Sequence, residues 1–147
     1  MTTIVPITPD YRDDWERLYK GYAEFYKVNQ TQAMRDRVWN WIQDPAHDVT
    51  GFLALDDSGK PIALAHFRPF YRPLMASIGG YFDDLFVDPT ARGSGAAQAL
   101  FAAIAEEGKK RGWSVIRWIT AEDNYRGRAV YDRVGTKTKW VTYDIPL

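Results

Sequence analysis

A glycine-rich segment in the second half of the chain has the composition of an anion-binding loop. It follows an apolar run and reads Arg92-Gly93-Ser94-Gly95-Ala96-Ala97. Glycines let a backbone approach a ligand closely, and the N–H groups at the start of a helix attract negative charge. The Gly-Lys-Ser/Thr of a nucleotide-binding P-loop and the third glycine of a dinucleotide-binding fingerprint are both missing. We therefore predict that the loop holds a phosphate through its amides and Arg92, without a metal ion.

A tyrosine further along the chain could donate a proton. Tyr131 stands seven residues after Asn124, within a short predicted helix that is followed by Gly135. Tyrosine has an ordinary pKa near 10, so its hydroxyl still carries a proton at neutral pH and can serve as a general acid. The alternative is an ordinary tyrosine on an amphipathic helix, with its hydroxyl at the surface.

Two adjacent carboxylates, Asp83 and Asp84, stand in a strand-like segment and could accept a proton from an amine. An alkylamine with a pKa of ~10.4 is almost wholly protonated at pH 7, and freeing it costs roughly 4–5 kcal/mol. Strand alternation puts the two carboxylates on opposite faces, so they cannot share one role. We expect Asp84 to be structural, bonded to backbone amides of a neighbouring loop. The alternative for the pair is a solvated strand end.

Strands and helices must alternate to position these residues. Apolar residues recur at helical spacing after Thr8-Pro9 and after Thr31. The further predicted helices cover Gly93–Arg111 and Tyr125–Val134, and the predicted strands cover Ile4–Ile7, Gly51–Leu55, Pro61–Phe67, Tyr81–Val87, Val115–Thr120 and Lys139–Ile145. The order βααβββαβαβ predicts an α/β (α+β) fold, in which helices flank a mixed, partly parallel central sheet.

The two motifs resemble those of the GNAT superfamily of acyl-CoA-dependent N-acetyltransferases. The loop Arg92–Ala97 is similar to the signature Gln/Arg-x-x-Gly-x-Gly/Ala, and Asn124, Tyr131 and Gly135 match a later family motif. This specific resemblance covers about Phe82–Gly135. Gly127 departs from the family's usual Ala, and Thr136 departs from its common Phe.

The resemblance implies a GNAT-like fold and the use of acetyl-CoA as co-substrate. The loop would bind the pyrophosphate of coenzyme A, and Asn124 would lie close to the same molecule. Tyr131 would also contact it and would protonate the departing thiolate. The expected cofactor-binding residues are Leu85, Phe86, Val87, Arg92, Gly93, Ser94, Gly95, Ala96, Ala97, Asn124 and Tyr131.

The acidic pair looks like that of the diamine and polyamine acetyltransferase branch. The likeness places Asp83 toward the acceptor, where it would bind the amine and act as a base. The first helix carries Tyr22 and Tyr26, which we expect to bind substrate by lining the acceptor pocket. Aromatic rings there could hold an alkyl chain and make cation–π contacts. The alternative is that most aromatic residues of this helix belong to the core.

Composition narrows the class of protein. The 147 residues predict one domain, 1–147, and the 19 basic and 19 acidic residues cancel, which argues against a nucleic-acid partner. No cysteine is present and there are only two histidines, so we expect no metal site. No apolar run approaches a membrane span, and no secretory signal is visible, so we expect a cytoplasmic protein without a membrane partner.

The leading hypothesis is therefore an enzyme, an acyltransferase that moves an acetyl group from acetyl-CoA to the primary amine of a small molecule. A polyamine, an alkylamine or an amino acid would attack directly in a ternary complex. One alternative is a protein N-terminal or lysine acetyltransferase, and another is a non-catalytic acyl-CoA-binding module. Aromatic content and family habit favour a homodimer.

Overall fold

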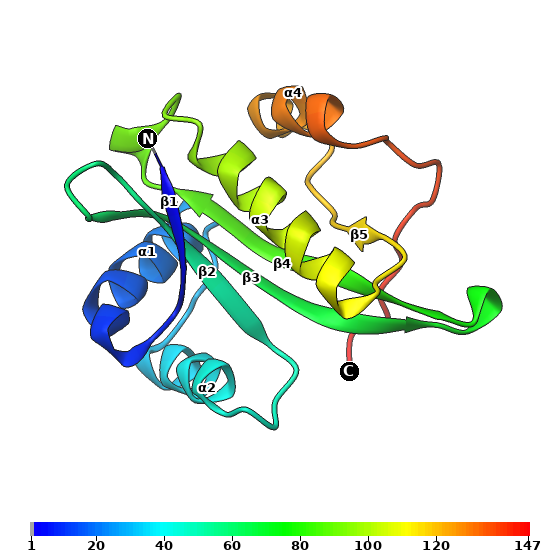
Figure 1. Cartoon of the computed structure of the whole chain (residues 1–147), viewed down its shortest axis with the longest axis horizontal. Coiled ribbons are helices and arrows are strands. Elements are labelled where there is room, and N and C mark those ends of the chain that lie inside the picture. The colour runs from blue at the N-terminus through cyan, green and yellow to red at the C-terminus, as the bar shows by residue number, and fades with distance from the viewer. Residues whose placement is uncertain (1) are drawn as a thin grey trace.

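The computed structural model describes residues 2–147 and contains one five-stranded sheet in the order β1-β2-β3-β4-β5 (Figure 1). The strands are β1 (Thr3–Pro6), β2 (Thr50–Leu55), β3 (Pro61–Arg72), β4 (Ser77–Val87) and β5 (Ile116–Arg117). Neighbours from β1 to β4 are antiparallel, whereas β5 runs parallel to β4. This mixed sheet confirms the predicted fold class.

Helices cover both faces of the sheet (Figure 1). They are α1 (Arg12–Phe25), α2 (Gln32–Gln43), α3 (Ala96–Arg111) and α4 (Tyr125–Val134). On one face, Trp15 and Leu18 of α1 belong to a buried cluster that α2 helps to cover. On the other face, Leu100 and Ile104 of α3 are fully buried in a second cluster. The sheet thus separates two apolar cores, and β4 contributes side chains to each.

The glycine loop delays the start of α3. Gly93 and Gly95 have φ angles of 83° and 84°, in the left-handed region that a right-handed helix cannot contain. The helix therefore begins at Ala96 rather than at the predicted Gly93. Its end is as predicted, because Gly112 with φ of 73° follows Arg111 and stops the helix.

A β-bulge changes the register between β3 and β4. His66 pairs with Asp84, but the next residue, Phe67, pairs with Phe82, so Asp83 is the extra residue. As a result Phe82 and Leu85 both pack into the cluster beneath α3. Strict alternation would have placed these two side chains on opposite faces.

The edge of β4 is open beyond its short contact with β5. The two strands pair only at Gly80–Ile116 and Tyr81–Arg117, so the predicted strand Val115–Thr120 is much shorter than expected. Among residues 2–147, no strand pairs with residues 82–87 of β4 on this edge. Backbone groups on this stretch are therefore free to meet a ligand.

The last predicted strand is wrong. Residues 139–145 form no strand, and the chain from Thr136 to Leu147 runs outside the sheet (Figure 1). Trp140 and Tyr143 are 85% and 89% exposed. A strand requires a hydrogen-bonded neighbour and a surface on which to bury its apolar side chains. This terminal segment has neither within residues 2–147.

No helix within residues 2–147 is long and apolar enough to cross a membrane.

Candidate active site

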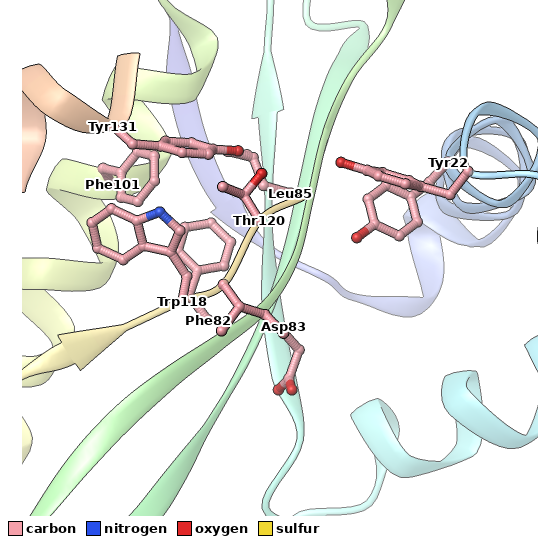
Figure 2. A pocket seen from close by; sticks show the side chains of 10 residues that line it. Tyr22, Phe82, Asp83, Leu85, Phe101, Trp118, Thr120 and Tyr131 are labelled. Atoms are coloured by element: carbon pink, nitrogen blue, oxygen red, sulfur yellow. The ribbon is translucent and has the colours of Figure 1, made fainter. Parts of the chain in front are cut away.

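A pocket opens where β4 loses its neighbour β5. It is a small cavity of about 30 Å³ that is partly open to solvent. Figure 2 shows Tyr131 entering from α4 on one side and Tyr22 from α1 on the opposite side, with Asp83 at one end. Tyr26 and Leu85 also line the pocket. Five residues predicted from the sequence, which come from three separate elements, are thus brought together.

Tyr131 is held as a protonated hydroxyl. Its ring contacts the rings of Phe101 and Trp118 edge to face, at centroid distances of 5.8 and 5.7 Å. Burial raises the pKa of the Tyr131 hydroxyl and the nearby Tyr26 adds to this, while a hydrogen bond with Thr120 opposes it. The hydroxyl therefore retains its proton at neutral pH, as a general acid must.

Asn124 caps the helix that carries Tyr131. Its side-chain oxygen accepts a hydrogen bond from the Gly127 amide at 3.1 Å, and its side-chain nitrogen donates to the Thr120 hydroxyl at 2.9 Å. A Cβ atom at position 127 would lie 2.5 Å from this side-chain nitrogen. The departure from the family's usual Ala therefore has a local reason, because glycine leaves room for the cap. Asn124 fixes the direction of α4 and hence the position of Tyr131.

The glycine loop is shaped to receive a ligand on its backbone. A Cβ added at Gly93 or at Gly95 would meet no heavy atom within 4 Å, so both residues border open space. Gly95 is the N-cap of α3 and offers no side chain to its amides. The Ser94 hydroxyl accepts a long hydrogen bond of 3.3 Å from the Ala96 amide. The loop is built from two left-handed glycines and the positive end of a helix, which suits an anion.

The loop's side chains divide between solvent and core. The Arg92 guanidinium lies over the Phe25 ring at 5.4 Å, close to the α1 end of the pocket. Ala96, the first residue of α3, is buried, whereas Ala97 is partly exposed. Arg92 is thus the one side chain of residues 92–97 that brings a positive charge.

The apolar end of β4 serves two faces. Leu85 lines the pocket, and Val87 packs into the same cluster beneath α3. Phe86 points to the opposite face and contacts the Tyr22 ring at 6.0 Å. Phe86 therefore packs against Tyr22 from the side opposite the pocket, and only the backbone of Phe86 lies on the open edge of β4.

Asp83 lines the pocket but has a cation beside it. The Arg68 Nε donates to both carboxylate oxygens, at 3.1 and 3.2 Å. Burial raises the pKa of Asp83, the Arg68 charge works against this, and the neighbouring Asp84 carboxylate reinforces it. The net direction is upward, which makes Asp83 a stronger base than an exposed carboxylate. In Figure 2 its carboxylate points away from Tyr131.

Asp84 contacts side chains and not the loop amides predicted for it. Its Oδ2 lies 2.8 Å from Nδ1 of His66 and accepts a hydrogen bond of 3.1 Å from the Tyr19 hydroxyl. Burial alone would raise the pKa of Asp84, but hydrogen bonds from His66, Tyr19 and Tyr22 outweigh it and lower the pKa. Asp84 is therefore an anion held on the α1 side of the sheet.

Two aromatic residues near the end of α1 reach the pocket, Tyr22 within the helix and Tyr26 directly after it, and the others do not. Tyr22 and Tyr26 line it, and their rings contact each other at a centroid distance of 4.9 Å with a tilt of 54°. Tyr19 is buried and Phe25 is 55% exposed. Burial and the nearby Asp84 charge raise the pKa of both Tyr22 and Tyr26. Tyr22 and Tyr26 therefore form a tyrosine wall that faces Tyr131 and carries neutral hydroxyls.

Several lining residues were not identified from the sequence. Phe82, Phe101, Trp118, Ile119 and Thr120 complete the pocket. Phe82 and Phe101 are both mostly buried. Thr120 could have been suspected, because it ends the predicted strand just before Asn124. Within residues 2–147 no group of three or more metal-ligating side chains is found.

The site combines an open strand edge, a glycine loop and a protonated tyrosine that faces the tyrosine wall. These features are what an acyl-transfer site needs. The chain belongs to the acetyltransferase (GNAT) family, whose sequence model matches residues 15–136. Membership confirms the resemblance inferred from the two motifs and supports an acyltransferase enzyme.

Curated relatives carry acetyltransferase names. A D-amino-acid N-acetyltransferase of Saccharomyces cerevisiae is 27% identical over 138 residues, covering 93% of this chain and 86% of that protein. A thialysine N-epsilon-acetyltransferase of Caenorhabditis elegans is 26% identical over 152 residues, covering 95% and 89%. The solved structure of AAC(6')-Iy with the bisubstrate analogue CoA-S-monomethyl-acetylneamine has a TM-score of 0.83 at 19% identity, covering 100% of this chain and 99% of that one. The last likeness shows the shared fold.

Proposed function

We propose that the protein transfers an acetyl group from acetyl-CoA to the primary amine of a small molecule, such as a polyamine, an alkylamine or an amino acid. Membership in the GNAT family and the names of the two relatives support this class of reaction. The observation that carries the proposal is the pocket itself, because a carboxylate and a protonated tyrosine line it at the open edge of β4.

Acetyl-CoA fits the residues along this edge. The amides of residues 93–97 and the Arg92 guanidinium would bind the pyrophosphate, since both glycines border open space. Leu85, Phe86 and Val87 pair with β3, and the backbone groups on their other edge, which β5 does not reach, would bind the adjoining chain. Asn124 would act near the same molecule through its hold on α4. None of these contacts requires a metal ion.

Asp83 is proposed to receive the acceptor. Its carboxylate would attract the ammonium form and then take its proton, directly or through water. The free amine nitrogen would form a bond to the acetyl carbon as the carbon–sulfur bond breaks, and the second proton that the nitrogen loses would pass to solvent. Burial raises the pKa of Asp83, which favours proton uptake. Tyr22 and Tyr26 would hold the alkyl part of the acceptor against their rings.

Tyr131 is proposed to protonate the sulfur that departs. Its hydroxyl keeps its proton because burial raises its pKa, and Figure 2 shows its side chain extending into the pocket. The thiolate and the phenol would exchange one proton, which leaves coenzyme A as a neutral thiol. The acid and the base would then reset through solvent.

A panel of acceptors tests the proposal. Purified protein is mixed with acetyl-CoA and with single amines, amino acids, polyamines or peptides, and release of free thiol is followed. We expect turnover with small cationic amines. Turnover of peptides alone would instead identify a protein acetyltransferase, and tight acetyl-CoA binding without any turnover would identify a binding module.

We also propose that the chain acts in the cytoplasm as one domain, residues 1–147, and as a homodimer. The exposed terminal segment supports a dimer, because Trp140, Val141, Tyr143 and Ile145 are all at least 75% exposed. Large apolar side chains gathered on one segment are typical of an interaction surface. Light scattering compares the oligomeric state of the full chain with that of a chain ending at Gly135. A full chain that is monomeric at every concentration contradicts the dimer.

A further inference from the structure

Two segments with the sequence pattern of a strand both lack a neighbour in the sheet. Residues 115–120 form only the two-residue strand β5, which is the last strand of the sheet, and residues 139–145 form no strand. An edge without a neighbour leaves a row of backbone N–H and C=O groups that can pair with another strand. One missing contact, between these two segments, would therefore account for both shortened elements.

The terminal segment keeps the side-chain pattern of a strand with one apolar face. Val141, Tyr143 and Ile145 alternate with Thr142 and Asp144. The three apolar side chains are each at least 75% exposed. β-Branched and aromatic residues in this arrangement fit a half-buried strand. The segment thus has an apolar face that nothing within residues 2–147 covers.

The free edge of β5 offers the matching alternation of side chains. Ile116 and Trp118 pack into the cluster beneath α3. Arg117, which stands between them, points to the other face of the sheet, where its guanidinium lies 5.2 Å from the centre of the Phe70 ring. A strand that pairs here must therefore present apolar side chains on the α3 face and a polar one between them.

The backbone of β5 is oriented to receive such a strand. The Val115 carbonyl accepts a hydrogen bond of 2.8 Å from the Gly80 amide of β4. Backbone groups of successive residues point to opposite edges of a strand, so the N–H and C=O of Ile116 and of Trp118 point away from β4. These groups are free to pair with a sixth strand.

Charge sets the register of the pairing. Neither Arg117 nor Asp144 forms an ion pair within residues 2–147. Unlike charges opposite each other stabilise a strand pair. An antiparallel strand with Asp144 opposite Arg117 pairs residues 116–120 in full. A parallel strand in the same register would bring Pro146 into the ladder, where it has no N–H to donate.

The apolar residues agree with this register. With Asp144 opposite Arg117, Tyr143 lies opposite Trp118 on the α3 face. Ile145 then lies opposite Ile116 on the same face. Aromatic and β-branched pairs at such positions stabilise antiparallel strands. Both the charged face and the apolar face of the segment thus find partners in one alignment.

We propose that residues 139–145 of a second copy of the chain form an antiparallel strand on the free edge of β5, and that the two copies exchange these segments. The inference rests on the homodimer proposed above and names its contact. The segment does not pair with its own β5, because it runs outside the sheet with its apolar side chains exposed (Figure 1). A twofold exchange pairs both edges of both copies through one contact, as closed dimers require.

The exchange would also complete the pocket. Ile119 lines the pocket and is 63% exposed. In the register above, Thr142 of the second copy lies opposite Ile119, and Trp140 lies at the diagonal position on the same face. A diagonal neighbour is within reach of a large aromatic side chain. The second copy therefore supplies a wall to the pocket where β5 leaves it open.

Engineered cysteines test the contact without any need for activity, because the chain has no cysteine of its own. Ile119→Cys and Thr142→Cys are made as two separate proteins, of which one carries a mass tag, and are mixed and oxidised. Opposite positions on antiparallel strands are about 4.5–5.5 Å apart, which a disulfide can span. We expect a covalent dimer that joins one chain of each kind.

Val141→Cys is the matched control for Thr142→Cys. Val141 is equally part of the exposed segment, at 75% exposure, but its side chain would point to the other face of the exchanged strand. Mixed with Ile119→Cys, it should form the covalent dimer at least about tenfold more slowly, because the two Cβ atoms point apart. Equal rates for Val141→Cys and Thr142→Cys overturn the register.

Charge reversal tests the ion pair that sets the register. Arg117→Asp and Asp144→Arg should each weaken the dimer by up to about fivefold, which is the usual range for an exposed ion pair. A mixture of the two proteins should regain the wild-type affinity in sedimentation measurements, since each heterodimer contains one contact with the charges exchanged. A mixture that dimerises no better than either variant overturns the pairing of these residues.

The outcomes separate the exchange from the proposals on which it rests. An internal disulfide in a monomeric Ile119→Cys/Thr142→Cys protein shows that the segment pairs with its own chain and overturns the exchange. A wild-type dimer whose cysteine variants form no mixed disulfide overturns the exchange but leaves the homodimer standing. The mixed disulfide in a protein that releases no thiol with any acceptor supports the exchange and contradicts acetyl transfer.

Discussion

Asp83 and Asp84 are neighbours in the chain, yet they belong to two different regions of the molecule. Asp83 is the extra residue of a bulge and faces an open pocket with Tyr131, Tyr22 and an exposed arginine partner. Asp84 faces the sealed side, among Trp15, His66 and Tyr19. Burial raises the pKa of both carboxylates. At Asp83 burial outweighs the Arg68 charge, whereas at Asp84 the hydrogen bonds from its partners outweigh burial. The balance between burial and side-chain partners therefore differs at these two adjacent positions.

The comparison suggests a division of labour across β4. The pocket side has an incomplete strand edge and a glycine loop, which leave backbone groups for a ligand or water to bond. The sealed side has its polar atoms bonded to one another and its apolar residues packed. We expect substitutions on the pocket side to change rates and ligand affinities, and substitutions on the sealed side to change stability and charge.

The largest expected effect is on the pocket side. Tyr131→Phe should lower kcat about 10²–10⁴-fold, because that is the usual contribution of a positioned general acid. The melting temperature should stay nearly unchanged, since the ring contacts with Phe101 and Trp118 remain. Tyr125→Phe is the control, because that tyrosine is on the same helix and is 74% exposed. An unchanged kcat at every pH at which chemistry limits turnover removes Tyr131 from the mechanism.

The next effect concerns the loop. Gly95→Leu should weaken coenzyme A binding about 100-fold. The leucine side chain would stand where the charged pyrophosphate approaches the backbone amides, and hydrogen bonds to a charged group would be lost. Gly59→Leu is a matched control: Gly59 has φ of 83° and also borders open space, but it lies in the β2–β3 turn. Both variants bear similar backbone strain, and only the first should lose affinity in calorimetry. A chelator should change neither result, and strict dependence on magnesium contradicts the metal-free site.

Much of the pocket side could be predicted from the sequence because its signals are local. The loop 92–97 and the spacing from Asn124 to Tyr131 each lie within one short segment, so their geometry follows from one turn or one helix. The bulge at Asp83 is different, since it depends on the pairing of two strands. Alternation alone could not place Phe82 and Leu85 on the same face.

The sealed side could not be assembled from the sequence. Trp15, His66 and Asp84 come from three elements, and the tryptophan is separated from the histidine by 51 positions. The sequence did not identify the partners of His66. The terminal strand over residues 139–145 failed for a related reason, because a strand-like pattern does not reveal whether a neighbouring strand is within reach.

A smaller effect should follow from substitution of Asp83, the carboxylate on the pocket side. Asp83→Asn should lower kcat/KM for cationic amines about tenfold, since one charge-assisted interaction is lost. The rate should recover as pH rises, because more of the amine is then already free base. Uncharged-amine analogues supply the control within the same variant. A uniform loss for all acceptors at all pH values points instead to a disturbed pocket.

The smallest effect separates the two carboxylates through stability. The pKa of Asp84 is lowered in the folded protein, so its charge stabilises the fold above the unfolded pKa of about 3.9, and this contribution is lost as pH falls through the folded value. Asp84→Asn should therefore cost about 1 kcal/mol at pH 7, in keeping with one charge-assisted hydrogen bond of a partly exposed group. The cost should shrink toward pH 3.

The pKa of Asp83 is raised, so the sign reverses for that residue. Its burial as an anion opposes folding at neutral pH. As pH falls through the pKa that Asp83 has in the folded protein, the wild-type protein should become more stable relative to Asp83→Asn. We expect a difference of no more than about 0.5 kcal/mol, because the Arg68 pair is partly exposed and screened by solvent. Urea unfolding of both variants at pH 7 and at pH 4 measures the two trends. Parallel pH trends in the two variants would show that one shared electrostatic environment, and not two, surrounds the pair.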